Sequence, residues 1–406
     1  MKKYLSIIAL ATLAIVGCGK VSTDVLGGDG EETPISFQAV KYLSQTKADE
    51  THGHLAFPDD AEFDVWAYFH DTKITGATTA PTLFQYFADV VSKNAGNWAP
   101  KNGPYYWPKT GMLSFFALYP TDAEGVECDA NGFSIKEYTV PALYTAQADI
   151  DNDLMFAQTL DQNCDENTEK HFADGVGLIF QHELAKVMFE GKLLTTKNYD
   201  SAAKKVNVGD VYFSAVIDEI SISGIKNIGT FALDNTTGKY LWTPKAGQDL
   251  VATSGVLVDM DYTPGLTDPF EYDKALPATE EFLTFREDNV STGDIIEYYV
   301  LPQKLADDAI ITVKYTVYAM GTNGKVISKT SYPDANHTAF TKKLNEFKTT
   351  VATTGDTALD EWEINKIYNY RFIIDPFEGE IYFDPCMADW DKVDADPVTI
   401  HPDVDN

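Results

Sequence analysis

Short apolar runs separated by turn-forming clusters recur along the chain, and they restrict its fold more than any other feature. Between Phe63 and His70, apolar residues alternate with others, which is typical of a β-strand with one buried face. The remaining runs are rich in β-branched and aromatic residues, which favour strands. They cover residues 113–119, 176–180, 220–225, 298–301, 311–317, 368–374 and 381–383.

Long amphipathic patterns with helical spacing are absent, and only Pro81–Ala88 and Thr338–Lys348 are modest helix candidates. The pattern therefore predicts an all-β protein built from β-sandwiches. A chain of 406 residues is too long for one ordinary core, which indicates two domains. A polar stretch around residues 244–249 is the expected boundary, giving an N-terminal domain of residues 35–245 and a C-terminal domain of residues 246–406.

The N-terminus has the features of a lipoprotein signal peptide. Lys2 and Lys3 precede an apolar stretch, Leu5–Gly17, that is too short to span a membrane permanently. It ends with an aliphatic residue and a glycine directly before Cys18, the pattern that signal peptidase II recognises. We expect a signal peptide of residues 1–17, lipidation of Cys18, and a polar tether over residues 18–34. The alternative is an ordinary secretory signal that happens to contain a cysteine.

Composition narrows the possible partners. The formal net charge is −31, so the folded body should repel nucleic acid and anionic lipid headgroups and stay soluble. Besides Cys18 the chain contains Cys128, Cys164 and Cys386. An exported protein can form disulfides, but an odd number leaves at least one thiol unbridged within the chain. The sequence leaves open whether Cys128 and Cys164 are bridged.

The sequence contains fragments of chemical motifs but no complete one. His182-Glu183 begins like the zinc motif HExxH, but Lys186 stands where the second histidine belongs, in a setting that favours a strand. Asp149–Asp153 begins like a calcium loop without its glycine and final glutamate, so we expect a solvated acidic turn. Asp200-Ser201-Ala202 and Asp356-Thr357-Ala358 resemble an O-glycosylation acceptor pattern, but three-residue patterns of this kind are common by chance. The sequence therefore predicts no catalytic residues, no cofactor and no metal site.

A series of segments in a fixed order resembles the fimbrillin family of Bacteroidales, the subunits of type V pili. The segments are Ile35–Phe37, Thr46–Ala48, Phe63–Tyr68, Trp98, Tyr105–Pro108, Leu113–Pro120, Asp153–Ala157, Leu178–Val187, Tyr368–Tyr370, Ile381–Phe383 and Trp390. The resemblance implies two tandem transthyretin-like Greek-key β-sandwich domains and a lipoprotein exposed on the outer membrane. It also implies proteolytic removal of an N-terminal strand, whose groove a strand from another pilin subunit then fills.

The residues after the tether suit that scheme. Ile35, Phe37 and Ala39 alternate with Ser36, Gln38 and Val40, as in a strand with one buried face. Losing this strand would expose apolar partners and an open sheet edge, and a strand from a neighbour would repair both. In the family the cut follows an arginine, which this region lacks. Lys47 occupies the comparable place, and Lys41 is the second candidate.

Two functions from different classes follow. The first is a structural or adhesive subunit of a surface fimbria. The second is a surface lipoprotein that binds glycans, for which solvent-facing tryptophans would be expected. Trp66 alternates with the apolar face of its segment and is the candidate for an outward position, whereas Trp107, beside Pro108, is expected to pack. The sequence leaves open whether a fimbrial subunit of this kind belongs to the stalk, the tip or the anchor, and which ligand it adheres to.

Overall fold

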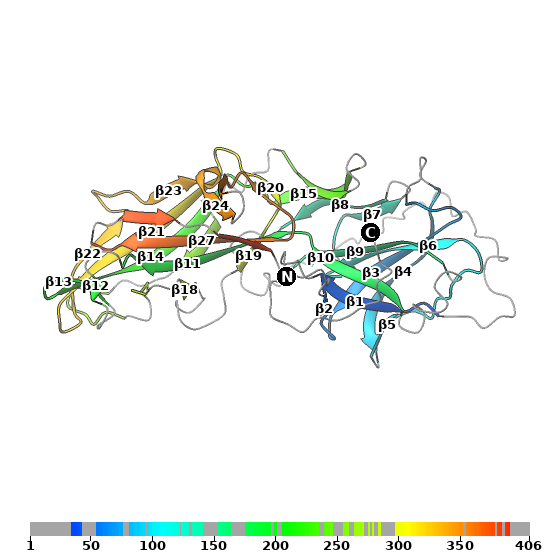
Figure 1. The fold of residues 1–406 in the computed structure, drawn as a ribbon, viewed down its shortest axis with the longest axis horizontal. Coiled ribbons are helices and arrows are strands. Elements are labelled where there is room, and N and C mark those ends of the chain that lie inside the picture. Colours follow the sequence, from blue (N-terminus) through cyan, green and yellow to red (C-terminus); the bar gives the residue numbers. More distant parts are fainter. Residues whose placement is uncertain are drawn as a thin grey trace, which may run out of the picture.

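The molecule is elongated and its described elements are β-strands apart from one short 3-10 turn, which confirms the predicted all-β class (Figure 1). The fold was analysed in a computed structural model. It describes residues 34–42, 54–75, 81–94, 96–121, 123–129, 132–140, 153–163, 175–195, 199–200, 205–234, 239–246, 255–259, 264–271, 275–276, 278–279, 283–285, 297–351, 355–377, 380–383 and 386–389.

One end of the molecule is built around an eight-stranded sheet that closes on itself, which we call the closed sheet. Its strands, in spatial order, are β10 (Val176–His182), β9 (Met155–Gln162), β6 (Met112–Tyr119), β3 (Glu62–His70), β4 (Phe84–Asn94), β5 (Asn97–Pro100), β1 (Phe37–Tyr42) and β2 (His54–Ala56). The ring closes because β1 pairs in parallel with β10, while its other neighbours β2 and β5 are antiparallel to it.

Both faces of the closed sheet are covered. On β3, Phe63, Val65, Ala67 and Phe69 point into the closed sheet's own core. On the opposite face, Tyr68 packs under a four-stranded sheet, in a second core with residues of β6, β8, β9 and β15. The four strands are β16 (Lys239–Pro244), β15 (Ile228–Asp234), β8 (Gly132–Thr139) and β7 (Val126–Asp129).

The other end of the molecule is a sandwich of two sheets, which we call the sandwich. One sheet contains β18 (Leu283–Thr284), β11 (Ala185–Leu193), β27 (Lys366–Asp375), β28 (Glu380–Phe383), β19 (Glu297–Val300) and β29 (Cys386–Asp389). The other contains β12 (Tyr199–Asp200), β13 (Lys205–Val208), β14 (Val211–Ser223), β21 (Ile310–Met320), β22 (Val326–Tyr332), β17 (Gly255–Asp259) and β23 (Phe340–Lys343). Two short pairs complete the fold, β20 (Gln303–Lys304) with β26 (Glu361–Trp362) and β24 (Lys348–Val351) with β25 (Gly355–Ala358).

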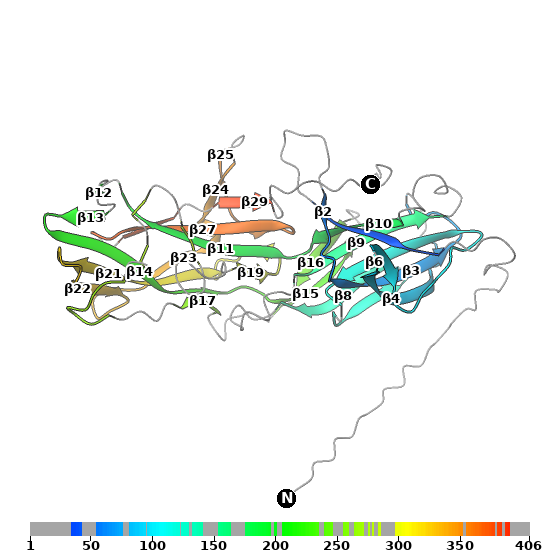
Figure 2. The same ribbon diagram turned by 90° about the horizontal axis from the view of Figure 1, so that it is seen from below.

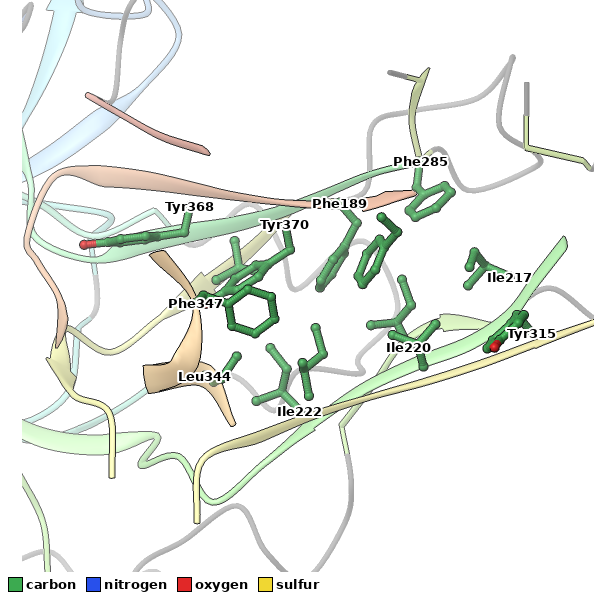
Figure 3. Close-up of a cluster of buried hydrophobic side chains, with 14 of the residues drawn as sticks. Phe189, Ile217, Ile220, Ile222, Phe285, Tyr315, Leu344, Phe347, Tyr368 and Tyr370 are labelled. Atoms are coloured by element: carbon green, nitrogen blue, oxygen red, sulfur yellow. The ribbon is translucent and has the colours of Figure 1, made fainter. Parts of the chain in front are cut away.

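The core of the sandwich lies between its two sheets (Figure 3). Phe189 of β11 and Tyr370 and Phe372 of β27 extend from one sheet, and the isoleucines of β14 extend from the other. The aromatic rings of Phe189 and Phe372 stack with centroids 6.0 Å apart. Because large side chains from both sheets fill this layer, most of the free energy that holds the sheets together comes from apolar burial.

The chain passes between the two ends more than once. The strand β10 of the closed sheet continues through Glu183 and Leu184 into β11 of the sandwich (Figure 2). After β14 the chain returns to the four-stranded sheet through β15 and β16. Residues 185–223 therefore pair with strands that follow residue 246, although they precede it in sequence. The expected domain boundary between residues 245 and 246 stays a prediction. Strand pairing connects residues on the two sides of this boundary.

Two expectations about helices were wrong. Phe84–Asn94, which overlaps the candidate at Pro81–Ala88, is the strand β4, and β3 pairs with it along eight residues. In the candidate at Thr338–Lys348, the strand β23 is followed by one 3-10 turn, Leu344–Glu346. Cross-strand packing of aromatic and β-branched side chains outweighed a weak local helical pattern in both places. Among the described residues, none lies in a helix that is long and apolar enough to cross a membrane.

Candidate subunit interface at the first strand

The alternating residues of the first strand are buried on one face, as their pattern predicted. Ile35, Phe37 and Ala39 all belong to the core of the closed sheet. The ring of Phe37 meets Phe63 and Phe115 edge to face, with centroids 6.5 and 5.5 Å apart. The side chain of Phe37 therefore lies between β3 and β6, two strands that do not pair with β1.

The backbone of β1 fills a gap between β10 and β5. Phe37 to Lys41 pair residue by residue with Val176 to Phe180 of β10. On the opposite edge, β1 and β5 share a single pair, Phe37 with Trp98, and β2 supplies the remaining contacts from Val40 to Tyr42. Ile35 donates a backbone hydrogen bond of 2.7 Å to the carbonyl of Tyr105. Strand β1 is thus held chiefly by one long ladder with β10.

Gly175 makes the start of this ladder possible, and the sequence alone did not single it out. Its φ is +91°, in the region that favours glycine, and Val176 donates a 2.8 Å hydrogen bond to the carbonyl of Ser36. A Cβ atom at Gly175 would lie 2.7 Å from the backbone nitrogen of Phe37. Since neither backbone can yield like a flexible side chain, a larger residue here would push β1 away from β10.

Of the residues predicted to be cleaved after or lipidated, only Lys41 belongs to the described chain. Lys41 lies inside β1, half-buried, and pairs with Leu55 on one side and Phe180 on the other. Lys47 belongs to the connection between β1 and β2 and lies outside the described residues. Cys18, which precedes β1, also lies outside them. Both roles therefore stay predictions.

The incomplete zinc motif lies where β10 passes into β11: His182 ends β10, Glu183 lies in the connection, and Lys186 belongs to β11, so the predicted strand setting is confirmed for His182 and Lys186. His182 and Glu183 are buried, and the Nδ1 atom of His182 lies 2.6 Å from a carboxylate oxygen of Asp153. Burial and the neighbouring Asp153 raise the pKa of Glu183 well above its ordinary value. The expectation of a solvated acidic turn is wrong for Asp153, which packs against the crossing strand. In the described part of the chain no group of potential ligands is arranged to hold a metal ion.

A Ser-His-Asp cluster that the sequence did not reveal lies where β3, β6 and β9 end together. The His70 imidazole places Nδ1 2.9 Å from the carbonyl of Thr72 and Nε2 2.9 Å from the hydroxyl of Ser114. Because the Thr72 carbonyl can only accept, Nδ1 is the donor in the first of these contacts. The Ser114 hydroxyl in turn accepts from the backbone N–H of Asp161. His70 and Ser114 are completely buried, so no substrate can reach the hydroxyl, and the cluster fastens one end of the closed sheet.

The Asp161 carboxylate in this cluster holds the loop that follows β3. It accepts backbone hydrogen bonds of 2.7 and 2.9 Å from Ile74 and Thr75. Burial alone would raise the pKa of Asp161, but hydrogen bonds from Thr75 and Ile74 and the nearby His70 outweigh it and lower the pKa. The carboxylate is a structural acceptor here.

Each tryptophan of the described chain packs against other side chains. Trp66 is half-buried, because it lies against the core under the four-stranded sheet and its ring is 5.6 Å from that of Phe133. Trp107 packs edge to face on Phe115, as expected. Trp98 and Trp362 are buried, and the indole of Trp242 donates to the carbonyl of Glu183 at 2.6 Å. The sixth tryptophan, Trp390, lies outside the described residues. Trp66 is therefore no part of a platform for sugars.

The structure leaves open whether any two of the cysteines form a disulfide. Cys128 is half-buried on β7, and its carbonyl accepts a hydrogen bond from Tyr68. Cys164 lies outside the described residues, and so does the side chain of Cys386.

Comparison with known proteins agrees with the fold. The model of a family described as fimbrillin-like matches residues 46–390. No curated protein matches the sequence. A crystal structure of a fimbrial protein from Bacteroides vulgatus is similar, with a TM-score of 0.50 and 13% identity, over 88% of this chain and 99% of that one. A fimbrilin from Porphyromonas gingivalis has a TM-score of 0.35 and 13% identity, over 87% of this chain and 98% of that one.

Proposed function

This chain belongs to the fimbrillin-like family, whose members are fimbrial structural proteins of the cell surface, and we propose that it assembles into a fimbria by strand exchange. In this proposal a protease removes the N-terminal strand β1, and a strand of another subunit takes its place in the closed sheet. The subunit serves a structural or adhesive role in the fimbria and reaches the surface as a lipoprotein of the outer membrane.

One observation carries the proposal: β1 is a core strand and the first of the described strands, so every other strand of the described fold follows it. Its partners β10 and β5 follow it by many residues, so removal of β1 leaves the remaining chain unbroken. The strand nevertheless contributes Phe37 to the core, and Ile35, two residues before it, is buried there as well. A segment that is both essential to the sheet and peripheral to the chain suits replacement by an equivalent strand from outside.

Physical chemistry favours refilling of the groove. Burial of Ile35 and Phe37 contributes about 2 kcal/mol for each side chain, which is lost when β1 leaves. The long ladder with β10 also loses its partner and becomes an exposed edge. An incoming strand with apolar residues at alternate positions restores both, because main-chain hydrogen bonds supply affinity and the core pockets supply register.

The proposed cleavage site is the peptide bond after Lys47, with Lys41 as the alternative. Lys41 is paired on both sides within the sheet, and a protease requires an extended segment that it can surround. Lys47 belongs to the connection between β1 and β2, and the polar stretch Ala48-Asp49-Glu50 follows it. These contrasts favour cleavage after Lys47 over cleavage after Lys41.

The proposed lipid anchor is supported by the sequence pattern that ends at Cys18. Acylation of Cys18 would attach the chain to the outer membrane, with residues 18–34 as a tether to the closed sheet. Cleavage after Lys47 would then release the folded body from both its first strand and its anchor in one step. Processing would thereby couple detachment from the lipid to readiness for assembly.

The proposal can be tested with recombinant residues 19–406, which lack the lipid. Trypsin is expected to create a new N-terminus at Ala48, after which size-exclusion chromatography should show a ladder of oligomers. The variant Lys47→Gln should keep β1 and stay monomeric, and the matched variant Lys41→Gln should behave like the parent. A parent protein that resists cutting at this position, or that is cut and remains monomeric or unfolds, would contradict the proposal.

A further inference from the structure

The segment that enters the closed sheet carries three inward side chains of different sizes. We call the space that residues 35–42 occupy the groove. Ile35 and Phe37 are large and Ala39 has only a methyl group, yet their exposed fractions are all small, at 2%, 2% and 6%. Because protein interiors are close-packed, a neighbouring side chain must occupy the space that a larger residue at position 39 would fill. The order of sizes along the segment therefore reflects the shape of the groove.

The strand register places Phe57 beside Ala39. Strand β2 pairs antiparallel with β1, with Val40 opposite Ala56, so the next two residues along this register are Ala39 and Phe57. Both side chains belong to the core of the closed sheet. On its other side Ala39 pairs with Leu178 of β10. Position 39 therefore lies between Phe57 and β10.

Phe57 is held in place by strands other than β1. Its side chain is 1% exposed, and its ring lies 4.6 to 5.8 Å from four aromatic rings of β3, β5, β6 and β10. The four are Phe63, Trp98, Tyr119 and Phe180. Phe57 also follows the proposed cleavage site at Lys47, so it stays with the subunit when β1 is released. The ring is thus in position before another strand enters.

Position 37 has the opposite requirement, because there the strand itself fills the core. The ring of Phe37 lies 5.5 Å from that of Phe115 and 6.5 Å from that of Phe63. A smaller residue at this position would leave a cavity and lose these contacts. Two successive inward positions of the groove therefore need a ring and a small side chain, respectively.

We propose that Phe57 selects the strand that fills the groove, and that this strand carries an aliphatic, an aromatic and a small residue at alternate positions, in that order. The inference rests on the proposed function and adds the chemistry of the incoming segment. A residue as large as leucine at the third position would have to displace Phe57 from four aromatic rings. Such overpacking weakens the binding of the strand.

Phe57 also fixes the register of the incoming strand. A slip by one residue turns the polar side chains of the strand toward the core, so burial alone prevents it. A slip by two residues keeps the apolar face inward, and burial does not exclude it. In one direction this slip brings the aromatic residue against Phe57, and in the other it leaves a cavity at position 37. The sizes of the side chains therefore exclude both slips.

The first experiment measures the size limit at position 39. Residues 19–406 are cleaved with trypsin, the trypsin is removed, and labelled peptides of residues 33–42 then compete for the groove. The peptide with Ala39→Leu is expected to bind about tenfold more weakly than the parent peptide, or more weakly still. Gln38→Leu is the matched control, because Gln38 is half-exposed on the opposite face, and its affinity should match the parent within about twofold.

A second peptide tests the order of the sizes. It carries Phe37→Ala together with Ala39→Phe, so its composition equals that of the parent peptide. It places a ring against Phe57 and a methyl group where a ring is needed. We expect no uptake at concentrations that saturate the groove with the parent peptide. Uptake equal to that of the parent peptide would mean that the groove recognises only apolar alternation, and would overturn the proposal.

The third experiment assigns the selection to Phe57. In the cleaved variant Phe57→Leu, the affinities for the parent and Ala39→Leu peptides should differ by no more than about threefold. Phe57→Met is a second variant, whose flexible side chain can yield, and it should lower the ratio of affinities as well. A variant that is merely destabilised binds both peptides more weakly and leaves the ratio unchanged. Phe87→Leu, which removes another buried ring of the closed sheet, is the matched control and should keep the parent ratio.

The outcomes separate this inference from strand exchange itself. If the cleaved parent protein takes up no parent peptide, strand exchange is wrong and selection by Phe57 is overturned with it. If it takes up the parent and Ala39→Leu peptides equally, or if both Phe57 variants keep the parent ratio, strand exchange stands and selection by Phe57 is wrong.

Discussion

The substitution Phe37→Ala tests most directly whether β1 is an integral part of the folded protein in solution. Phe37 is 2% exposed and contacts two aromatic rings from strands on the far side of the core. Alanine keeps the backbone ladder with β10 and removes only the ring. Gln38→Ala is the matched control, because Gln38 is the next residue of the same strand and its side chain is half-exposed.

The expected loss follows from burial. Replacing a fully buried phenylalanine by alanine costs about 3–5 kcal/mol, since the ring loses its transfer free energy and leaves a cavity. The two edge-to-face contacts contribute about 0.5–1.5 kcal/mol each beyond burial. Gln38→Ala should change stability by no more than about 0.5 kcal/mol, as for other partly exposed polar positions.

Hydrogen exchange read by mass spectrometry is a suitable assay, because a chain with several cores need not unfold in one step. The peptide that covers β10 reports on β1 directly, since the two strands pair over five residues. A loss of about 3 kcal/mol accelerates exchange of its amides more than a hundredfold. A peptide from β21, in the sandwich, should exchange at the parent rate.

Two results would refute this reasoning. Acceleration of the β10 peptide by less than about threefold, a change near 0.6 kcal/mol, would mean that β1 is not seated in the core in solution. Equal acceleration of β10 and β21 would mean that Phe37 supports the whole molecule, and that β1 cannot be exchanged without unfolding it.

Three further predictions concern other parts of the chain. Gly175→Ala should speed the exchange of β1 for a labelled peptide of residues 33–42, because the added Cβ would lie 2.7 Å from the backbone nitrogen of Phe37. Gly209→Ala is the matched control and should leave the exchange rate unchanged, because Gly209 also has a positive φ but no atom lies within 4 Å of its added Cβ. Asp218→Asn should raise the free energy of unfolding by on the order of 2 kcal/mol at pH 7.5 and hardly change it at pH 3.5. Thermal denaturation at the two pH values measures this, and an equal gain at both would contradict the prediction. The reason is that burial raises the pKa of Asp218 to about 6, so the folded state holds its proton more tightly and stability falls between about pH 4 and pH 6. Cys18→Ala should move the protein from the membrane to the soluble fraction, and retention after a high-salt wash would place the anchor elsewhere.

The sequence predicted those parts of the fold that depend on local alternation. The strands β3, β21 and β27 occupy the expected segments because buried residues alternate along much of each. Strand β6 was predicted from a continuous apolar run, and it is buried on both faces. The buried face of β1 was predicted from alternation as well. The orientation of Trp66 was predicted wrongly, since alternation shows that a residue lies on the opposite face but not that a second sheet covers that face.

Contacts between segments that are distant in sequence could not be predicted in this way. The cluster of His70, Ser114 and Asp161 joins three strand ends whose residues show no motif spacing. The role of Gly175 depends on the approach of β1, which comes from the other end of the closed sheet's sequence. Both features result from tertiary pairing, and a single sequence carries no local signal for it.

Each end of the molecule contains a parallel strand pair between segments distant in sequence. The strands β1 and β27 of these pairs differ in how they are connected to the rest of the chain, and this difference supports the choice of β1 as the exchanged strand. β1 pairs in parallel with β10, and β27 pairs in parallel with β11, the direct continuation of β10. Strand β27 is fixed from both sides of the chain, because β26 precedes it and the hairpin to β28 follows it. Strand β1 is the first strand of the described chain, and only its C-terminal end continues into another described strand. Removing β27 would therefore require two cuts and would open the core of the sandwich, whereas one cut after β1 frees a complete strand. A protein that is assembled by strand replacement needs one such strand, and in the described chain β1 meets the requirement.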